Sequence, residues 1–160
     1  MIHDDDVPAH SPEGEAFTKF VIETFRLNGR LLEAGDDLCA DLGLSSARWQ
    51  VLGAIDEDQL PVAHIARNMG LTRQAVQRVA DELEREGFIA FSENPHHRRA
   101  KLAGLTAKGR AALDEVTERQ IVWANDIAAD IDPTTLSTAV ALCEMLRKRL
   151  TDKHRNEGEA

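Results

Sequence analysis

The sequence has few cysteines and no long apolar run, and each shortage excludes a class of protein. Cys39 and Cys143 are the only two cysteines, and neither stands in a C-x-x-C pair. This usage predicts neither a disulfide framework nor a metal knuckle, and it favours reduced thiols in the cytoplasm. No apolar run approaches the roughly 18 residues of a membrane span, and the acidic first residues lack the apolar core of a signal peptide. We therefore expect a cytoplasmic protein that does not contact a membrane.

Positive charge is also scarce, with 19 Lys+Arg against 28 Asp+Glu and a net charge of −9. Over the whole chain this balance argues against a nucleic-acid partner. The charge is unevenly distributed, however, because residues 1–62 carry net −9, residues 63–101 net +2 and residues 102–160 net −2. Since salt screens charges beyond about 10 Å, the middle segment alone would set the field that a polyanion meets on contact.

Hydrophobic periodicity predicts helices over most of the chain. Apolar positions from Phe17 to Leu42 predict one long amphipathic helix, weakened by glycines. Ser45 is the expected N-cap of the next helix, Pro61 opens a third and Thr72 caps a fourth. Near the end of the chain, two more helices are expected after Thr106 and Asp132.

The short link Gly70-Leu71-Thr72 between the third and fourth helices is typical of a helix-turn-helix. In the helix that follows, Ala75, Val79 and Leu83 are expected to point inward. The polar side chains of its first two turns are expected to point outward, and the acids come only afterwards. An anion at this end of the helix would therefore meet donors and the positive end of the helix dipole together. These outward residues are Arg73, Gln74, Gln77 and Arg78.

Two short strands, in the segments 88–92 and 101–105, are expected after that helix, and Asn94-Pro95 marks the turn between them. Residues 94–101 hold two histidines and three cations without an acid. The element order is thus four helices, two strands and two helices. The cations and histidines of the turn are His96, His97, Arg98, Arg99 and Lys101.

This order resembles the MarR family of winged helix-turn-helix regulators. The hairpin "NPHHRRAKLAGLTAKGRAAL" places Pro95, Arg99, Leu105, Thr106 and Gly109 where the family wing has its Pro turn, Arg and "LT-x-x-G" pattern. "IARNMGLTRQAVQRVADELEREGFI" matches the family core, and the resemblance spans about residues 15–150. The chain departs from the family at His97, which stands where a wing Asp usually pairs with the Arg. Histidine cannot form that bidentate pair.

The resemblance implies a mainly α (α+β) fold, a winged helix-turn-helix with long terminal helices that form a dimerisation region. The implied organisation is a flexible acidic tail (1–13), an N-terminal dimerisation helix (14–43), a DNA-binding region (44–105), C-terminal dimerisation helices (106–151) and a flexible tail (152–160). A monomer could also cover the apolar stripes of the terminal helices internally.

The implied function is sequence-specific binding of double-stranded DNA by a homodimer, as a ligand-responsive repressor on a pseudo-palindromic operator. The sequence shows no nucleophile with a partner base and no metal ligands at helical spacing, so we expect no enzymatic activity, catalytic residue, cofactor or metal. A small aromatic effector would bind near Arg26, Arg48 and Trp49. The expected DNA contacts are Thr72, Arg73, Gln74, Gln77, Arg78, His96, His97, Arg98, Arg99 and Lys101.

Other interpretations remain open from the residues alone. The polar face of the fourth helix could be merely solvated, and the chain could be a helical protein-interaction module without DNA binding. His96-His97 could suggest a metal site, although adjacent histidines on a turn point apart. Both cysteines are expected to be buried, and Trp49 and Trp123 are expected in the core.

Overall fold

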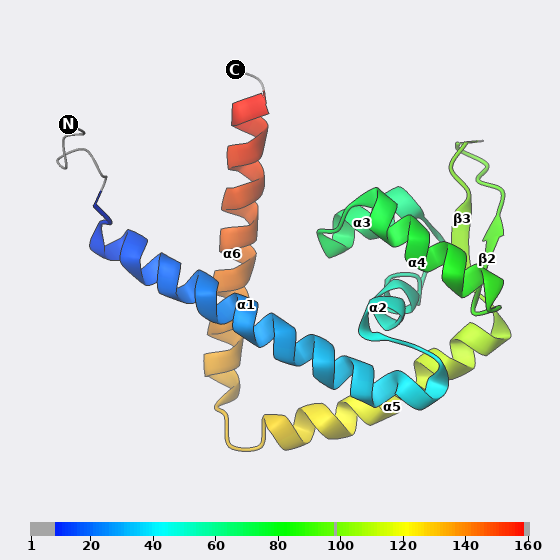
Figure 1. Cartoon of the computed structure of the whole chain (residues 1–160), viewed down its shortest axis with the longest axis horizontal. Coiled ribbons are helices and arrows are strands. Elements are labelled where there is room, and N and C mark those ends of the chain that lie inside the picture. The colour runs from blue at the N-terminus through cyan, green and yellow to red at the C-terminus, as the bar shows by residue number, and fades with distance from the viewer. Residues whose placement is uncertain (1–8, 98, 159–160) are drawn as a thin grey trace, which may run out of the picture. The chain divides into compact units, whose positions relative to one another are not determined.

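A computed structural model describes residues 9–97 and 99–158 of the chain. The chain is divided into two compact units, one within residues 1–120 and the other within residues 121–160. The first unit contains α1 (Pro12–Cys39), η1 (Ala40–Leu42), α2 (Ser46–Ala54), β1 (Leu60–Pro61), α3 (Val62–Met69), α4 (Arg73–Arg85), β2 (Ile89–Ser92), β3 (Leu102–Leu105) and the first part of α5 (Ala107–Ile127) (Figure 1). The second unit contains the rest of α5 and α6 (Pro133–Gly158).

Helix ends follow the caps that the sequence predicts. The Ser45 hydroxyl accepts a hydrogen bond from the Arg48 N–H at 3.4 Å, which satisfies one free donor at the start of α2. Gly70 ends α3 in the left-handed region with φ 66°, a conformation that suits glycine. Helix α1 begins at Pro12 rather than at residue 14, and α6 continues to Gly158 beyond residue 151.

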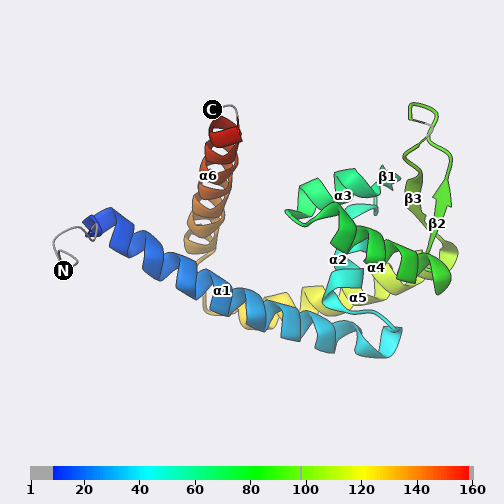
Figure 2. The ribbon, with the colours of Figure 1, turned by 45° about the horizontal axis from the view of Figure 1, so that its top comes forward.

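The sheet has three antiparallel strands in the order β1-β3-β2 (Figure 2). β2 and β3 confirm the predicted hairpin, with Ile89 opposite Leu105 and Phe91 opposite Ala103. β1 was not predicted from the sequence, because two residues are too few to show an alternating pattern. Its Leu60 pairs with Ala103 and so joins the end of the loop after α2 to the hairpin.

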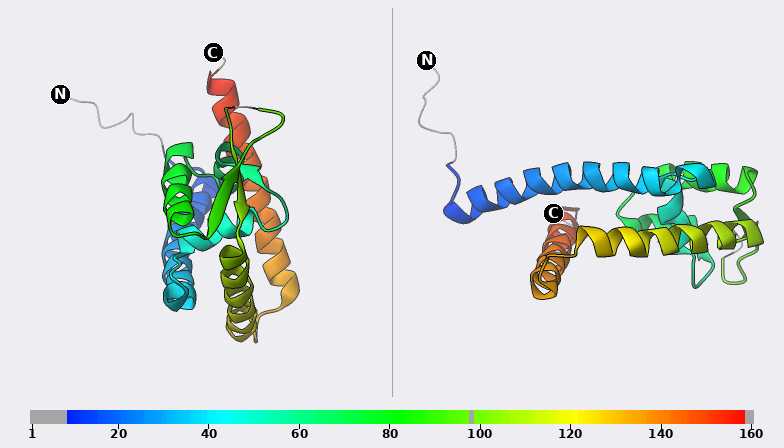
Figure 3. Two further views of the ribbon diagram at one scale, coloured as in Figure 1. Left: turned by 90° about the vertical axis from the view of Figure 1, so that its right-hand side faces the viewer. Right: turned by 90° about the horizontal axis from the view of Figure 1, so that it is seen from below.

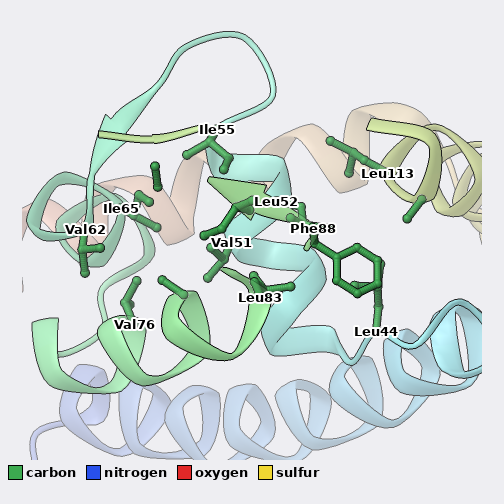
Figure 4. Packing of buried hydrophobic residues seen from close by; sticks show 14 of the residues in the cluster. Leu44, Val51, Leu52, Ile55, Val62, Ile65, Val76, Leu83, Phe88 and Leu113 are labelled. Carbon is green, nitrogen blue, oxygen red and sulfur yellow. The ribbon is translucent and has the colours of Figure 1, made fainter. Parts of the chain in front are cut away.

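The hydrophobic core lies in the first unit, among α2, α3, α4, the hairpin and the start of α5. Leu52, Ile65 and Leu83 are completely buried there, each at 0% exposure. Figure 4 shows side chains from α2 and α4 converging with Phe88 around Leu52 and Leu83. This packing fixes which side of α4 is left for solvent.

Close contacts attach α1 and α5 to this core. The buried Gly35 of α1 lets α2 approach, so that the Ser46 hydroxyl donates to the Leu32 carbonyl at 2.7 Å. At the start of α5, the Thr106 hydroxyl accepts from the Gly109 N–H at 3.1 Å and caps the helix as predicted. Further along α5, Arg119 donates to Asp41 at 2.5 Å, so the first part of α5 lies beside the end of α1 (Figure 3).

The terminal helices expose much of their apolar surface. Phe25 of α1 is 72% exposed and Val122 of α5 is 70% exposed. Cys39 is buried as expected, and its burial raises the pKa of the thiol. Cys143 is exposed, so the expectation that it is buried was wrong for the single chain. The apolar residues near it on α6, such as Val140 and Leu142, are exposed too, so this face of the helix is not covered within the described chain.

Gly109 generates a stability prediction, because an added Cβ there would lie 1.9 Å from the Phe88 carbonyl oxygen. We expect Gly109→Ala to lower the free energy of unfolding by about 1–3 kcal/mol, since α5 must move away from the hairpin. Gly53 of α2 is the matched control, because an added Cβ there meets nothing within 4 Å. Gly53→Ala should leave stability unchanged or raise it by up to about 1 kcal/mol. Urea unfolding followed by circular dichroism measures both, and equal effects would contradict the assigned contact.

Candidate nucleic-acid interface

Helix α4 is positioned by its cap and by one buried stripe. The Thr72 hydroxyl accepts from the Ala75 N–H at 3.1 Å, which confirms Thr72 as the N-cap. Val76, Ala80 and Leu83 are the buried residues of the helix. The expectation that Ala75 points inward was wrong, because Ala75 is exposed. The stripe follows the spacing i, i+4, i+7 from Val76, and Ala75 lies about 100° around the helix from it.

The opposite side of α4 presents the polar residues that the sequence assigned to DNA. Arg73, Gln74 and Arg78 are exposed, and Gln77 is half-buried. Gln77 is held by a neighbour one turn later, since its Nε2 donates to Asp81 Oδ1 at 2.7 Å. The N-terminal half of this face therefore carries long donors, and its first carboxylate is Asp81.

The loop between β2 and β3, called the wing from here on (residues 93–101), extends beside α4 (Figure 2). Asn94 is buried at 8% exposure, and its Oδ1 accepts from the N–H groups of His96 and His97 at 2.9 and 3.3 Å. This Asn turn holds the histidine backbone while both imidazoles stay exposed. Arg98, one of the expected contacts, lies outside the described residues.

One cleft of about 390 Å³ brings the two groups of residues together. Arg73 and Gln77 line it from α4, and Arg99 and Lys101 line it from the wing. Gln74 and Arg78 line a neighbouring hollow along α4, together with Arg73 and Gln77. His96 and His97 are not among the residues that line these two hollows.

Among the described residues, several cations elsewhere in the first unit are paired with carboxylates, whereas the cations of this face are not. Arg48, Arg110 and Arg119 each form ion pairs with carboxylates, and Lys19, Arg26 and Arg30 do so on α1. Within the described ranges 9–97 and 99–158, no ion pair within 4 Å joins a carboxylate to the cations of α4's first turns or of the wing. Their charge is therefore available to an anion from outside. These cations are Arg73, Arg78, Arg99 and Lys101.

The residues assigned to an effector are not brought together. Arg26 is exposed on α1 and pairs with Glu23 at 3.3 Å. Arg48 is mostly buried and donates to both oxygens of Glu86 at 2.8 and 2.7 Å. This bond lowers the pKa of the Glu86 carboxyl and raises that of Arg48, so the pair stays charged at neutral pH. Arg48 thus ties α2 to the end of α4.

Trp49 is half-buried and packs against the core. It also lines a hollow of about 350 Å³ between α1 and α2, whose described lining residues include neither Arg26 nor Arg48. The hollow is lined by Asn28, Leu31, Leu32, Gly35, Ser46, Trp49, Gln50 and Gly53.

Sequence reasoning missed two acids of the cleft. Asp81 and Glu84 line it alongside Arg73 and Gln77. The signal was present in the sequence, because Arg73, Gln77 and Asp81 are each four residues apart and must share one face of a helix. The α4 acids had been expected only to follow the donors along the chain, and no role had been assigned to them.

Comparisons with known proteins agree with this geometry. The sequence model of the MarR family matches residues 42–100, which include α2 to α4 and most of the wing. The uncharacterized protein Rv2011c of Mycobacterium tuberculosis is 39% identical over 122 residues, covering 76% of this chain and 85% of that protein.

Solved structures share the fold. The M. tuberculosis regulator MosR, determined in complex with DNA, matches with a TM-score of 0.69 and 22% identity over 81% of this chain and 96% of that one. CouR from Rhodococcus jostii RHA1, determined with p-coumaroyl-CoA, matches with a TM-score of 0.69 and 24% identity over 76% of this chain and 86% of that one.

The fold is that of a winged helix-turn-helix protein, with exposed cations on α4 and on the wing. The chain belongs to the MarR family, and it is a DNA-binding transcription regulator rather than an enzyme. Among the residues that the structure describes, no helix is long and apolar enough to cross a membrane.

Proposed function

We propose that the chain acts in the cytoplasm as a homodimeric, ligand-responsive repressor on a pseudo-palindromic operator. The observation that carries this proposal is the cleft between α4 and the wing, where Arg73, Arg99 and Lys101 converge without carboxylate partners within 4 Å among the described residues. Double-stranded DNA is a dense polyanion, and a surface that follows it gains affinity by releasing its counterions.

In this proposal the first two turns of α4 enter the major groove. Arg there suits the O6 and N7 acceptors of guanine, and Gln suits the N6 and N7 edge of adenine. The wing follows the phosphates or enters the adjacent minor groove. The proposed contacts are Thr72, Arg73, Gln74, Gln77 and Arg78 from the helix, and His96, His97, Arg98, Arg99 and Lys101 from the wing.

Dimerisation is proposed through the terminal helices, residues 14–43 and 106–151, on either side of the DNA-binding region 44–105. Large exposed apolar side chains support it, because such patches are rare on monomers and mark interfaces. A homodimer would place two α4 helices about one DNA turn apart on the two half-sites of a palindrome. The exposed apolar residues on these helices are Phe17, Ile22, Phe25, Leu27, Leu31, Leu32, Ile121, Val122, Ile127, Leu136, Val140, Leu142, Met145 and Leu150.

A ligand response is proposed through the hollow at Trp49. Its apolar residues, Leu31 and Leu32, and its indole suit an aromatic ring, while Asn28 and Gln50 supply polar contacts. That CouR was determined with p-coumaroyl-CoA supports an aromatic effector for this fold. A ligand there would contact α1 and α2 together and would favour one spacing of the two α4 helices in the dimer. Because a duplex is rigid, a change in that spacing changes the affinity for DNA. Arg26 and Arg48, which are not among the described residues that line this hollow, complete the proposed set of effector contacts.

The DNA-binding surface is tested by removing one charge at a time. With about three to four phosphate contacts per subunit, log K against log[salt] should have a slope near −5 to −7 for the dimer. Arg99→Ala should weaken binding to all sequences and flatten the slope by about 2, since each protomer loses one contact. Gln74→Ala should instead change the sequence preference. Fluorescence anisotropy on duplexes selected from random DNA measures both.

Lys19→Ala is the matched control for charge, because Lys19 is an exposed α1 cation paired with Glu15. It should leave the affinity and the slope unchanged. If the wild-type chain selects no DNA, or if Arg99→Ala behaves like Lys19→Ala, the assigned surface is wrong.

The dimer is tested at the exposed apolar residues of the terminal helices. The wild-type chain should have twice the 17.7 kDa mass of one chain by light scattering. Phe25→Glu and Val140→Glu place a charge on α1 and α6, and we expect at least one of them to halve the mass because burying an unpaired carboxylate is unfavourable. Leu71→Glu, at an exposed apolar residue outside these helices, should stay dimeric. A monomeric wild type, or dimers in both helix variants, would contradict the proposal.

The ligand response is tested by fluorescence, since the chain has two tryptophans. In Trp123→Phe, titration with phenolic and other aromatic carboxylates should change the emission of Trp49, and the same compounds should release bound DNA. Trp49→Phe is the matched control and should show no change. If Trp49→Phe, in which only Trp123 remains, responds equally, the ligand binds elsewhere. If none of the aromatic carboxylates produces a response, the proposed regulation is contradicted.

A further inference from the structure

We propose that Asp81 is a positioning residue for sequence recognition, which fixes the Gln77 amide so that it reads an adenine. This inference rests on the proposed function, because it assigns a base to one residue of the proposed DNA-binding face. Asp81 is exposed on α4 one turn after Gln77, and both line the cleft that faces the wing.

The hydrogen bond between the two side chains fixes which way the amide faces. Gln77 Nε2 lies 2.7 Å from Asp81 Oδ1. An ionised carboxylate can only accept hydrogen bonds, so it attracts the NH₂ end of the amide and repels the oxygen end. The carboxylate therefore excludes the flipped orientation of the Gln77 amide.

The bond also determines what remains for DNA. A Gln amide has two N–H donors and one oxygen acceptor, and Asp81 takes one of the donors. In this proposal Asp81 takes the N–H that points away from Oε1, so that the other N–H and Oε1 remain side by side. An adenine presents one acceptor, N7, beside one donor, N6, in the major groove. The two sets match, whereas guanine presents two acceptors there and leaves Oε1 without a partner.

Holding Gln77 in place also reduces the entropy lost on binding. A free Gln side chain loses rotamer freedom when it is fixed. In the chain without DNA, the bond to Asp81 already restricts it, so less is lost on contact with the base.

Asp81 has a second, opposite effect, because its charge lies on a face that approaches phosphates. Arg73, Gln77 and Asp81 follow one stripe of α4, and Glu84 adds a second carboxylate to the same cleft. Repulsion from both acids lowers affinity for any DNA sequence. A variant of Asp81 can therefore gain overall affinity while it loses the preference for one base, and the two effects must be measured separately.

Three variants separate positioning from charge. Asp81→Asn removes the charge but keeps an oxygen that can accept from Gln77. Asp81→Ala removes both. Glu84→Gln is the matched control, because it removes one charge from the same cleft at a residue for which no side-chain bond with Gln77 is found among the described contacts. The probes are the duplex selected by the wild-type chain and all its single base-pair substitutions, and Gln77→Ala identifies the base pair that Gln77 reads.

We expect the wild type to prefer A·T at that pair by roughly 5- to 150-fold over the other pairs. Glu84→Gln should bind all duplexes more tightly and keep this preference. Asp81→Asn should gain affinity by a similar factor but keep only part of the preference, because its amide can also donate to Oε1 of a flipped Gln77. Asp81→Ala should gain affinity as well but lose the preference at that one pair.

Three results would overturn the inference while leaving the proposed function intact. The first is a wild type that selects an operator but has no A·T preference at the pair read by Gln77. The second is Asp81→Ala with an unchanged base preference. The third is Glu84→Gln with the same loss of preference as Asp81→Ala. A wild-type chain that selects no sequence would overturn the proposed function and this inference with it.

Discussion

Burial of one stripe of α4 is the constraint on which the rest of the structure depends. Val76, Ala80 and Leu83 are fixed against the core, so the side chains on the opposite side of the helix must point away from the core. A small rotation of α4 would bring Arg73 and Gln77 toward apolar side chains, where unpaired polar groups are strongly disfavoured. Arg48 strengthens the same constraint from α2, because its bidentate bond to Glu86 holds the last turn of the helix.

The chain combines an acidic total with a cationic face, and several of the cations outside this face are paired with carboxylates. Arg48, Arg110 and Arg119 are neutralised locally by carboxylates, and they join elements of the fold. On the cleft, Arg99 and Lys101 lie on a hairpin that offers few acids. The net charge of −9 over residues 1–62 disfavours a polyanion along that part of the chain. The placement on α4 and the wing of cations that form no ion pair among the described residues, rather than the total number of basic residues, favours a polyanion at the cleft.

Local signals made much of the fold predictable, and contacts between distant segments made the rest unpredictable. Ser45, Thr72 and Thr106 could be assigned as caps because a cap is a property of a few neighbouring residues. The strand β1 and the Arg48–Glu86 bond join residues far apart in the sequence, and no periodic pattern in the sequence indicates such contacts. Ala75 was misplaced because an alanine fits either side of a helix. Cys143 was misplaced because an apolar stripe indicates that a face will be covered but does not say by which chain. For the candidate interface, the exposure of Arg73, Gln74 and Arg78 could be predicted from the sequence, whereas the hydrogen bond between Gln77 and Asp81 is seen only in the structure.

The attachment of α5 has a consequence for how such regulators can diversify. Gly109, Arg110 and Arg119 hold α5 to the first unit, and all three lie before residue 121. Changes in residues 121–132 would therefore leave the side chains proposed to read bases, and their supports, untouched. In the proposed homodimer, the same changes would alter the separation of the two α4 helices, and hence the number of base pairs between half-sites. Under that proposal, spacing and base preference would be encoded in separate stretches of the chain and could evolve independently.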